Sequence, residues 1–112
     1  MLARLAHGAG RGAFFVTEWL DILKEQTAAG DKMTTTVTDM LADPAILEEQ
    51  VKTLFDALEE QADFVEKLRV ALEKFGYDFP VIQAAERLEE RYGDLAASVA
   101  EKLKALRVSR ED

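Results

Sequence analysis

Residues 75–80, Phe75-Gly76-Tyr77-Asp78-Phe79-Pro80, separate two segments that carry the same heptad pattern of apolar side chains. In the first segment the pattern residues are spaced alternately by four and three positions. They are Leu47, Val51, Leu54, Leu58, Gln61, Val65, Leu68, Leu72 and Phe75. The second segment repeats this spacing over Val81, Ala85, Leu88, Tyr92, Leu95, Val99, Lys102 and Leu106. Such spacing is typical of helices that pack lengthwise against one another.

A chain reversal at Tyr77 pairs the two patterns layer by layer. Phe75 then lies opposite Val81, and at the far end Val51 lies opposite Leu106. In every pair the two residue numbers sum to 156 or 157, so one register satisfies the whole length. The sequence therefore predicts an all-α fold built on a long antiparallel helical hairpin, with helices over about 44–75 and 80–107.

Residues with strong preferences for helix ends agree with these limits. Asp43 precedes Pro44, and Asp78 precedes Phe79-Pro80. A capping residue followed closely by proline is a typical helix start. Gly76 follows the last pattern residue of the first helix, where a left-handed glycine often ends a helix. We therefore expect the two helices to begin at the two prolines and the first to end at this glycine.

The apolar face of the first hairpin helix is broader than a two-helix coiled coil needs. Phe55 and Phe64 flank the heptad pattern. Leaving them in water would forgo about 1.5–3 kcal/mol each, so a further element should cover this face. Residues 13–28 supply a candidate, because Trp19 and its large apolar neighbours lie opposite a polar face at helical spacing. We predict an amphipathic N-terminal helix there, and hence a three-helix or oligomeric helical bundle.

Composition assigns the remaining segments. Residues 31–43 are predicted to connect the amphipathic helix region, 13–30, to the hairpin region, 44–112. The run Thr34-Thr35-Thr36-Val37-Thr38 has poor helix propensity, so the connector should be extended, with one helical turn allowed over 39–42. Residues 1–12 are rich in glycine and are predicted to be a flexible or partner-bound arm. Their arginines and lack of acids are also compatible with an organellar transit peptide. A length of 112 residues fits a single domain overall.

The residue types that catalysis or metal binding require are scarce. The chain has no cysteine and one histidine, His7, in a Gly/Ala stretch. This leaves no Cys/His or Ser/His/Asp arrangement and no Glu-x-x-His pair of the di-iron bundles. Glu59, Asp63 and Glu66 share a helix face outside the heptad pattern, where solvated acids are expected more than a carboxylate metal site. We predict no enzyme activity, no catalytic residue, no cofactor and no metal.

The chain is acidic, with a formal net charge of −8. Residues 39–78 hold eleven acids against four bases, so the outer face of the first hairpin helix is either a solvated surface or the complement of a basic partner. An acidic surface repels phosphate, and nucleic-acid binding is therefore not expected. No apolar run approaches the roughly 18 residues that span a bilayer. We predict a cytoplasmic protein or one inside a large assembly.

Two groups of residues are candidates for function. Trp19 is the only tryptophan, and it either anchors the core of the bundle or docks into a partner subunit, where aromatic anchors dominate binding. The residues predicted to bind a partner are Phe14, Phe15, Trp19, Leu20, Leu23, Phe55 and Phe64. Gln61 is predicted to hydrogen-bond the Tyr92 hydroxyl and so fix the register of the hairpin. Gly93, next to Tyr92, indicates a close backbone approach or a bend.

No motif in the chain is specific to one activity, and the broad apolar faces favour a function in helix packing. We predict a non-catalytic structural or adaptor subunit that packs through helix–helix contacts inside a larger protein assembly, such as a multi-subunit complex or a phage particle. Its partner is another protein or a second copy of the chain. The alternative is a regulatory or chaperone-like protein that engages its partner through the Trp19 helix.

Overall fold

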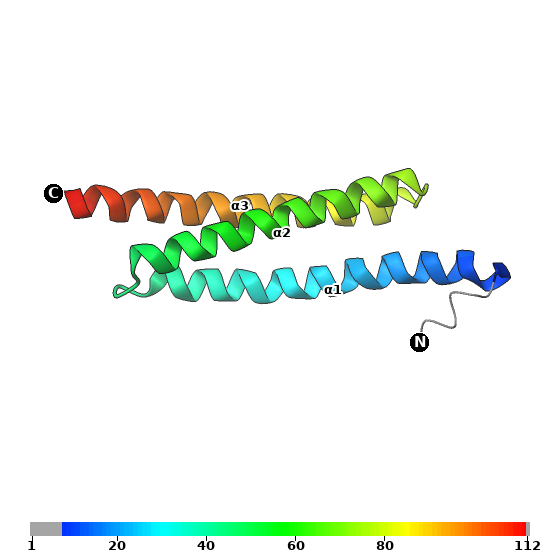
Figure 1. Ribbon diagram of the computed structural model, residues 1–112, viewed down its shortest axis with the longest axis horizontal. Coiled ribbons are helices and arrows are strands. Elements are labelled where there is room, and N and C mark those ends of the chain that lie inside the picture. The colour runs from blue at the N-terminus through cyan, green and yellow to red at the C-terminus, as the bar shows by residue number, and fades with distance from the viewer. Residues whose placement is uncertain (1–7, 112) are drawn as a thin grey trace.

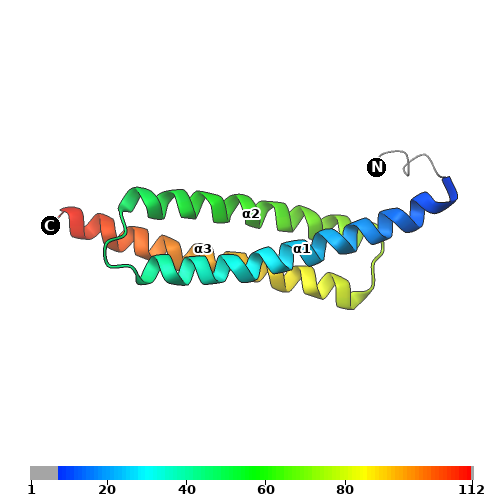
Figure 2. The same cartoon turned by 90° about the horizontal axis from the view of Figure 1, so that it is seen from below.

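The computed structural model describes the backbone of residues 8–111 and the side chains of residues 18–110. This part of the chain forms three helices, α1 (Gly8–Ala42), α2 (Glu48–Lys74) and α3 (Phe79–Glu111). Helices α2 and α3 make an antiparallel hairpin, and α1 runs along it (Figures 1 and 2). The predicted all-α fold, with a long hairpin and a third helix, is confirmed.

The core follows the two heptad patterns. The buried apolar side chains of α2 are Val51, Leu54, Leu58, Val65, Leu68 and Leu72. Those of α3 are Ala85, Leu88, Tyr92, Ala96, Val99 and Leu103. Ala96 and Leu103 are not members of the heptad pattern but flank it, so the buried face of α3 is broader than the pattern itself. The side chains at the two ends of the first heptad pattern are not buried, since Leu47 is 62% exposed and Phe75 is 56% exposed.

Ion pairs between α2 and α3 show the register of the hairpin directly. Arg69 Nε lies 2.5 Å from Glu89 Oε1 near the turn. At the open end, Glu48 receives both Arg107 and Arg110, at 3.2 Å and 2.9 Å. The numbers of these paired residues sum to between 155 and 158, which brackets the register that the apolar pattern predicted. Helix α3 continues to Glu111, four residues beyond its predicted end, and Arg110 in this added turn pairs with Glu48.

The turn between α2 and α3 is a Schellman motif centred on Gly76. Gly76 has a φ of 74°, in the left-handed region. Its N–H donates to the carbonyl of Glu73 at 3.1 Å, and the N–H of Tyr77 donates to the carbonyl of Leu72 at 3.1 Å. These two bonds satisfy carbonyl groups that the helix end would otherwise leave without partners. The predicted glycine cap is therefore confirmed.

Replacing Gly76 with alanine should lower the free energy of unfolding by about 1 kcal/mol, because an L-residue is strained in the left-handed region. A Cβ at this position would meet no heavy atom within 4 Å, so the cost comes from the backbone alone. Urea denaturation followed by circular dichroism measures the change. Equal stability of the variant and the wild type would show that Gly76 does not hold this conformation in solution.

The predicted connector over residues 31–43 is wrong, because α1 remains helical up to Ala42. Val37 is 2% exposed, and its burial in the core outweighs the poor helix propensity of the threonines around it. Thr34 and Thr38 donate their hydroxyl protons to the carbonyls of Gly30 and Thr34, each at 2.8 Å. Such bonds to the preceding turn keep the hydroxyl groups compatible with a helix.

The predicted start of the first hairpin helix at Pro44 is also wrong, since α2 begins at Glu48. Asp43 begins a tight turn instead, in which its side chain accepts a hydrogen bond from the N–H of Ala45 at 2.9 Å. Its carbonyl accepts the N–H of Ile46 at 3.2 Å, and the turn buries the Ile46 side chain. Aspartate followed by proline is as typical of a turn as of a helix start.

Close helix contact occurs at Gly30, and not at Gly93, where a close approach was one of the two interpretations of the sequence. A Cβ built on Gly30 would lie 2.9 Å from Leu88 Cδ1 and 3.7 Å from Tyr92 Cε2. A Cβ built on Gly93 would have no neighbour within 4 Å. Gly30 is thus a buried residue within α1 that lets this helix approach α3, and it does not end a helix.

Candidate functional site

The predicted partner-binding residues are not all on one surface. Leu23 is buried in the core, and Trp19 and Phe55 are partly buried and pack against it. Phe64 is 44% exposed on α2. The predicted residues Phe14 and Phe15 lie outside the described side chains. Trp19 thus packs against the core of its own bundle while staying partly exposed, and its role in partner binding stays a prediction.

A shallow apolar hollow lies where the α2–α3 turn meets α1. Its volume is about 290 Å³, and it is lined by Leu20, Phe75, Gly76, Tyr77, Asp78 and Val81. The Trp19 ring borders it, with its centroid 5.9 Å from that of Phe75 and the two planes tilted by 35°. We call Leu20, Phe75, Tyr77, Phe79 and Val81 the turn-end surface. Two segments distant in sequence, Leu20 of α1 and residues 75–81 of the turn, meet there. Of the predicted partner-binding residues whose side chains are described, Leu20 alone belongs to this surface.

Phe79 is the most exposed large apolar residue of the described chain, at 70%. The sequence interpretation treated it only as part of the start of the second helix. Its position off the heptad pattern, two residues before Val81, could have identified it, because an aromatic side chain there has no place in the hairpin core. Phe75, at 56% exposed, was assigned to the core pattern and contacts Trp19 instead.

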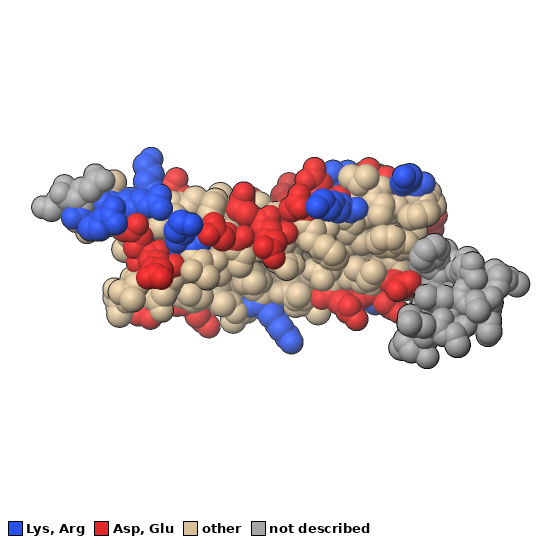
Figure 3. Space-filling model, in the orientation of Figure 1, with Lys and Arg blue, Asp and Glu red and all other residues tan. Residues whose placement is uncertain are grey.

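The two ends of the molecule differ in the charge of their side chains. Figure 3 shows lysines and arginines gathered over the end where α3 finishes, and acids along the middle of the visible face. Glu48, which pairs with Arg107 and Arg110, lies at the basic end. Large areas between the charges are neither acidic nor basic (Figure 3). The turn-end surface is at the opposite end of the hairpin from the basic cluster (Figure 1).

The predicted hydrogen bond between Gln61 and Tyr92 is not formed in the described structure. Tyr92 is 1% exposed and points toward α1, where a Cβ on Gly30 would lie 3.8 Å from its hydroxyl oxygen. Burial raises the pKa of the Tyr92 hydroxyl above its ordinary value, since the anion would lose its solvation. The register instead rests on apolar layers and on Arg69, whose pKa is raised chiefly by its hydrogen bond to Glu89.

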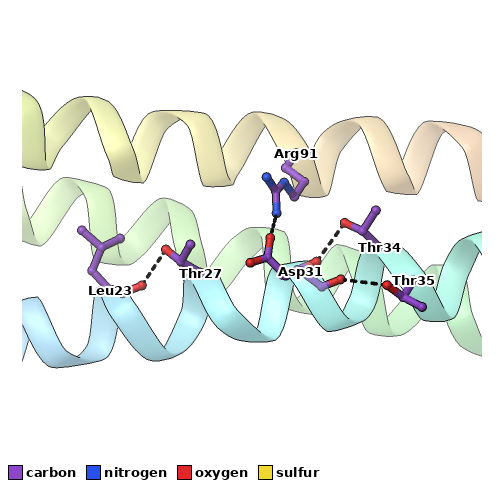
Figure 4. A network of polar contacts seen from close by, with 7 residues as sticks. Leu23, Thr27, Asp31, Thr34, Thr35 and Arg91 are labelled. Atoms are coloured by element: carbon purple, nitrogen blue, oxygen red, sulfur yellow. Dashed lines mark hydrogen bonds and ion pairs between the residues drawn. The ribbon is translucent and has the colours of Figure 1, made fainter.

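The polar contacts between α1 and α3 are on the outside of the bundle. Figure 4 shows Arg91 reaching from α3 to the carboxylate of Asp31, between the threonines whose hydroxyls bond to the α1 backbone. The two side chains of this ion pair are 43% and 65% exposed. An open depression of about 490 Å³ adjoins them and is lined by Asp31, Thr34, Arg87, Glu90, Arg91, Asp94 and Leu95. Its mixed charges do not form a site of one sign.

Within the described residues, no group of three or more histidine, aspartate or glutamate side chains could hold a metal ion. In the same part of the chain, none of the three helices is long and apolar enough to cross a membrane. Comparison of the chain with protein-family models, with curated proteins and with solved structures finds no match in any of the three.

Proposed function

We propose that this chain is a non-catalytic structural or adaptor subunit that packs through helix–helix contacts inside a larger protein assembly, such as a multi-subunit complex or a phage particle. The observation that carries the proposal is the turn-end surface, where Phe79 and Phe75 are 70% and 56% exposed beside an apolar hollow. Two exposed aromatic side chains close to an apolar hollow are typical of protein interfaces. Aromatic residues of this kind commonly dominate the binding energy.

The charge distribution supports a partner contact at that end. Arg107 and Arg110 at the far end of the hairpin are engaged by Glu48. The turn-end surface is largely apolar, with Asp78 as the acid that lines its hollow. A partner helix with an apolar face fits such a surface better than a nucleic acid does, because the acidic chain repels phosphate.

Replacement of Phe79 by glutamate should weaken association with the partner or second copy at least tenfold. The matched control is Val108→Glu, which places the same charge on an exposed residue at the other end of α3, where Val108 is 53% exposed. Light scattering across a concentration series, together with identification of any co-purifying protein, measures association. A monomer without a bound protein, or equal losses in the two variants, would contradict the proposed function.

A second candidate function is favoured by the placement of Trp19. Its ring packs against Phe75 within the same chain, yet its indole N–H is buried and has no hydrogen-bond partner. We infer that a regulatory or chaperone-like protein could use α1 in this way, holding Trp19 in its own bundle until a partner offers a better site. In that case the isolated chain is a stable monomer, and it binds its partner only when the partner protein is added.

A further inference from the structure

Among the described side chains of α1, two buried polar atoms have no hydrogen-bond partner. They are the Nε1 donor of Trp19 and the Oε1 acceptor of Gln26. The two residues are seven positions apart, which is about two helical turns, so they lie on the same side of α1. A buried polar atom without a partner costs folding free energy that water would restore if the atom were exposed. Both atoms therefore oppose the packing of α1 on the hairpin.

The apolar packing of α1 is also weaker than that of the other helices. Among its described side chains, Leu23 and Val37 are the fully buried apolar ones, whereas α2 and α3 contribute six each. The other described apolar side chains of α1 that pack on the core are only partly buried; they are Trp19, Ile22, Met33, Met40 and Leu41. Gly30 lets α1 approach α3 but buries no side chain of its own. The free energy that holds a helix in a bundle comes mainly from buried apolar area, so α1 is held least strongly.

The polar links show the same asymmetry. Between α2 and α3, Arg69 and Glu89 are only 20% and 31% exposed, and Glu48 is 27% exposed where it binds two more exposed arginines. Between α1 and α3, Arg91 and Asp31 are 43% and 65% exposed, so the sheltered pair, Arg69–Glu89, belongs to the hairpin. Exposed ion pairs contribute little to stability because water and salt screen them. The hairpin therefore keeps its strongest contacts if α1 leaves.

We propose that α1 separates from the α2–α3 hairpin as one unit, in a local opening that leaves the hairpin helical. Opening gives Trp19 Nε1 and Gln26 Oε1 hydrogen-bond partners in water and uncovers Leu88 and Tyr92 beneath Gly30. The closed state predominates because Leu23, Val37 and the partly buried Trp19 stay packed. As a device for partner binding, this opening rests on the proposed function, in which an uncovered apolar surface accepts a helix. The opening itself requires no partner.

Native-state hydrogen exchange on the full chain tests the opening. Central amides of α1, over residues 22–40, should exchange at least tenfold faster than central amides of α2 and α3. Gln26→Leu removes the unpaired acceptor and should slow exchange in α1 at least threefold, while exchange in the hairpin stays unchanged. The matched control is Gln83→Leu, which makes the same change on α3 and should leave α1 exchange within twofold of the wild type.

A reversible clamp gives a second test in the same molecule. The chain has no cysteine, and a Cβ on Gly30 would contact the Leu88 side chain, so a Gly30→Cys, Leu88→Cys pair is the chosen site for a disulfide between α1 and α3, with its formation checked by thiol titration. Oxidation should bring α1 exchange to the rate of the hairpin, and reduction of the same protein should restore the fast rate. The reduced protein is thus its own control for the two substitutions.

A single common exchange rate for α1 and the hairpin in the wild type would overturn the proposal, since the three helices would then unfold together. This outcome is independent of the association measurements. Fast α1 exchange in a chain that binds no partner would leave the opening established and contradict the proposed function. A common exchange rate in a chain that binds through Phe79 would contradict the opening of α1 and support the proposed function.

Discussion

Tyr92→Ala is expected to lower the free energy of unfolding by about 3–5 kcal/mol, the usual cost of removing a large aromatic ring from a core. Tyr92 is 1% exposed and is the largest fully buried side chain of the described chain. Its ring lies under Gly30, in the contact between α3 and α1. Truncation leaves a cavity that rigid helices cannot close, so the loss exceeds the transfer free energy of the removed atoms.

Urea denaturation of Tyr92→Ala, followed by circular dichroism and by Trp19 fluorescence, measures this loss. The control is Val108→Ala on the same helix, where the side chain is 53% exposed and a change within about 0.5 kcal/mol is expected. Equal effects of the two substitutions would show that Tyr92 is not enclosed between the helices in solution.

Gly30→Leu should have the second largest effect, a loss of about 1–3 kcal/mol. The first added carbon would already lie 2.9 Å from Leu88 Cδ1, and the rest of the side chain must displace Leu88 and Tyr92 or push α1 away from α3. Leucine favours a helix over glycine by roughly 0.5–1 kcal/mol, which offsets only part of this cost. The same denaturation experiment, with Trp19 as the probe of α1, measures the result.

Gly93→Leu is the matched control for Gly30→Leu. It makes an identical change in another helix, at an exposed position where a Cβ meets nothing within 4 Å. This variant should gain roughly 0.5–1 kcal/mol, because only the helix propensity changes. Two glycines with opposite responses would confirm that Gly30 is the point of close helix contact. Stabilisation by both substitutions would contradict it.

The hairpin could be predicted from the sequence because its evidence is periodic and repeated. Val51, Leu58, Leu72 and Val99 recur at heptad spacing on both sides of Gly76, so one register satisfies every layer. The extent of α1 could not be predicted in this way, since the threonines around Val37 disfavour a helix locally. These residues are helical because Val37 is buried, and its burial depends on helices that are distant in sequence.

The candidate site was less predictable than the fold. The turn-end surface forms only when Leu20 of α1 meets Phe75 and Val81 across the hairpin turn, and no sequence period shows that meeting. Gly30 was predicted to lie at the boundary between a helix and a connector, and Gly93 inside a helix, so the sequence did not mark Gly30 as a point of helix contact; packing alone shows it. Phe79 was not predicted as a site residue either, although its place off the heptad pattern leaves it without a core position and could have identified it.

The tight turn at Gly76 and the arginine contacts to Glu48 also order the events of folding. Closing the turn requires only the few residues between Leu72 and Tyr77, whereas Arg107 and Glu48 are 59 residues apart. Loop closure costs more entropy as the loop lengthens, so the hairpin should pair first at Gly76 and extend layer by layer toward Glu48. Each layer then shortens the loop that the next must close, and α1 joins a hairpin that is already formed.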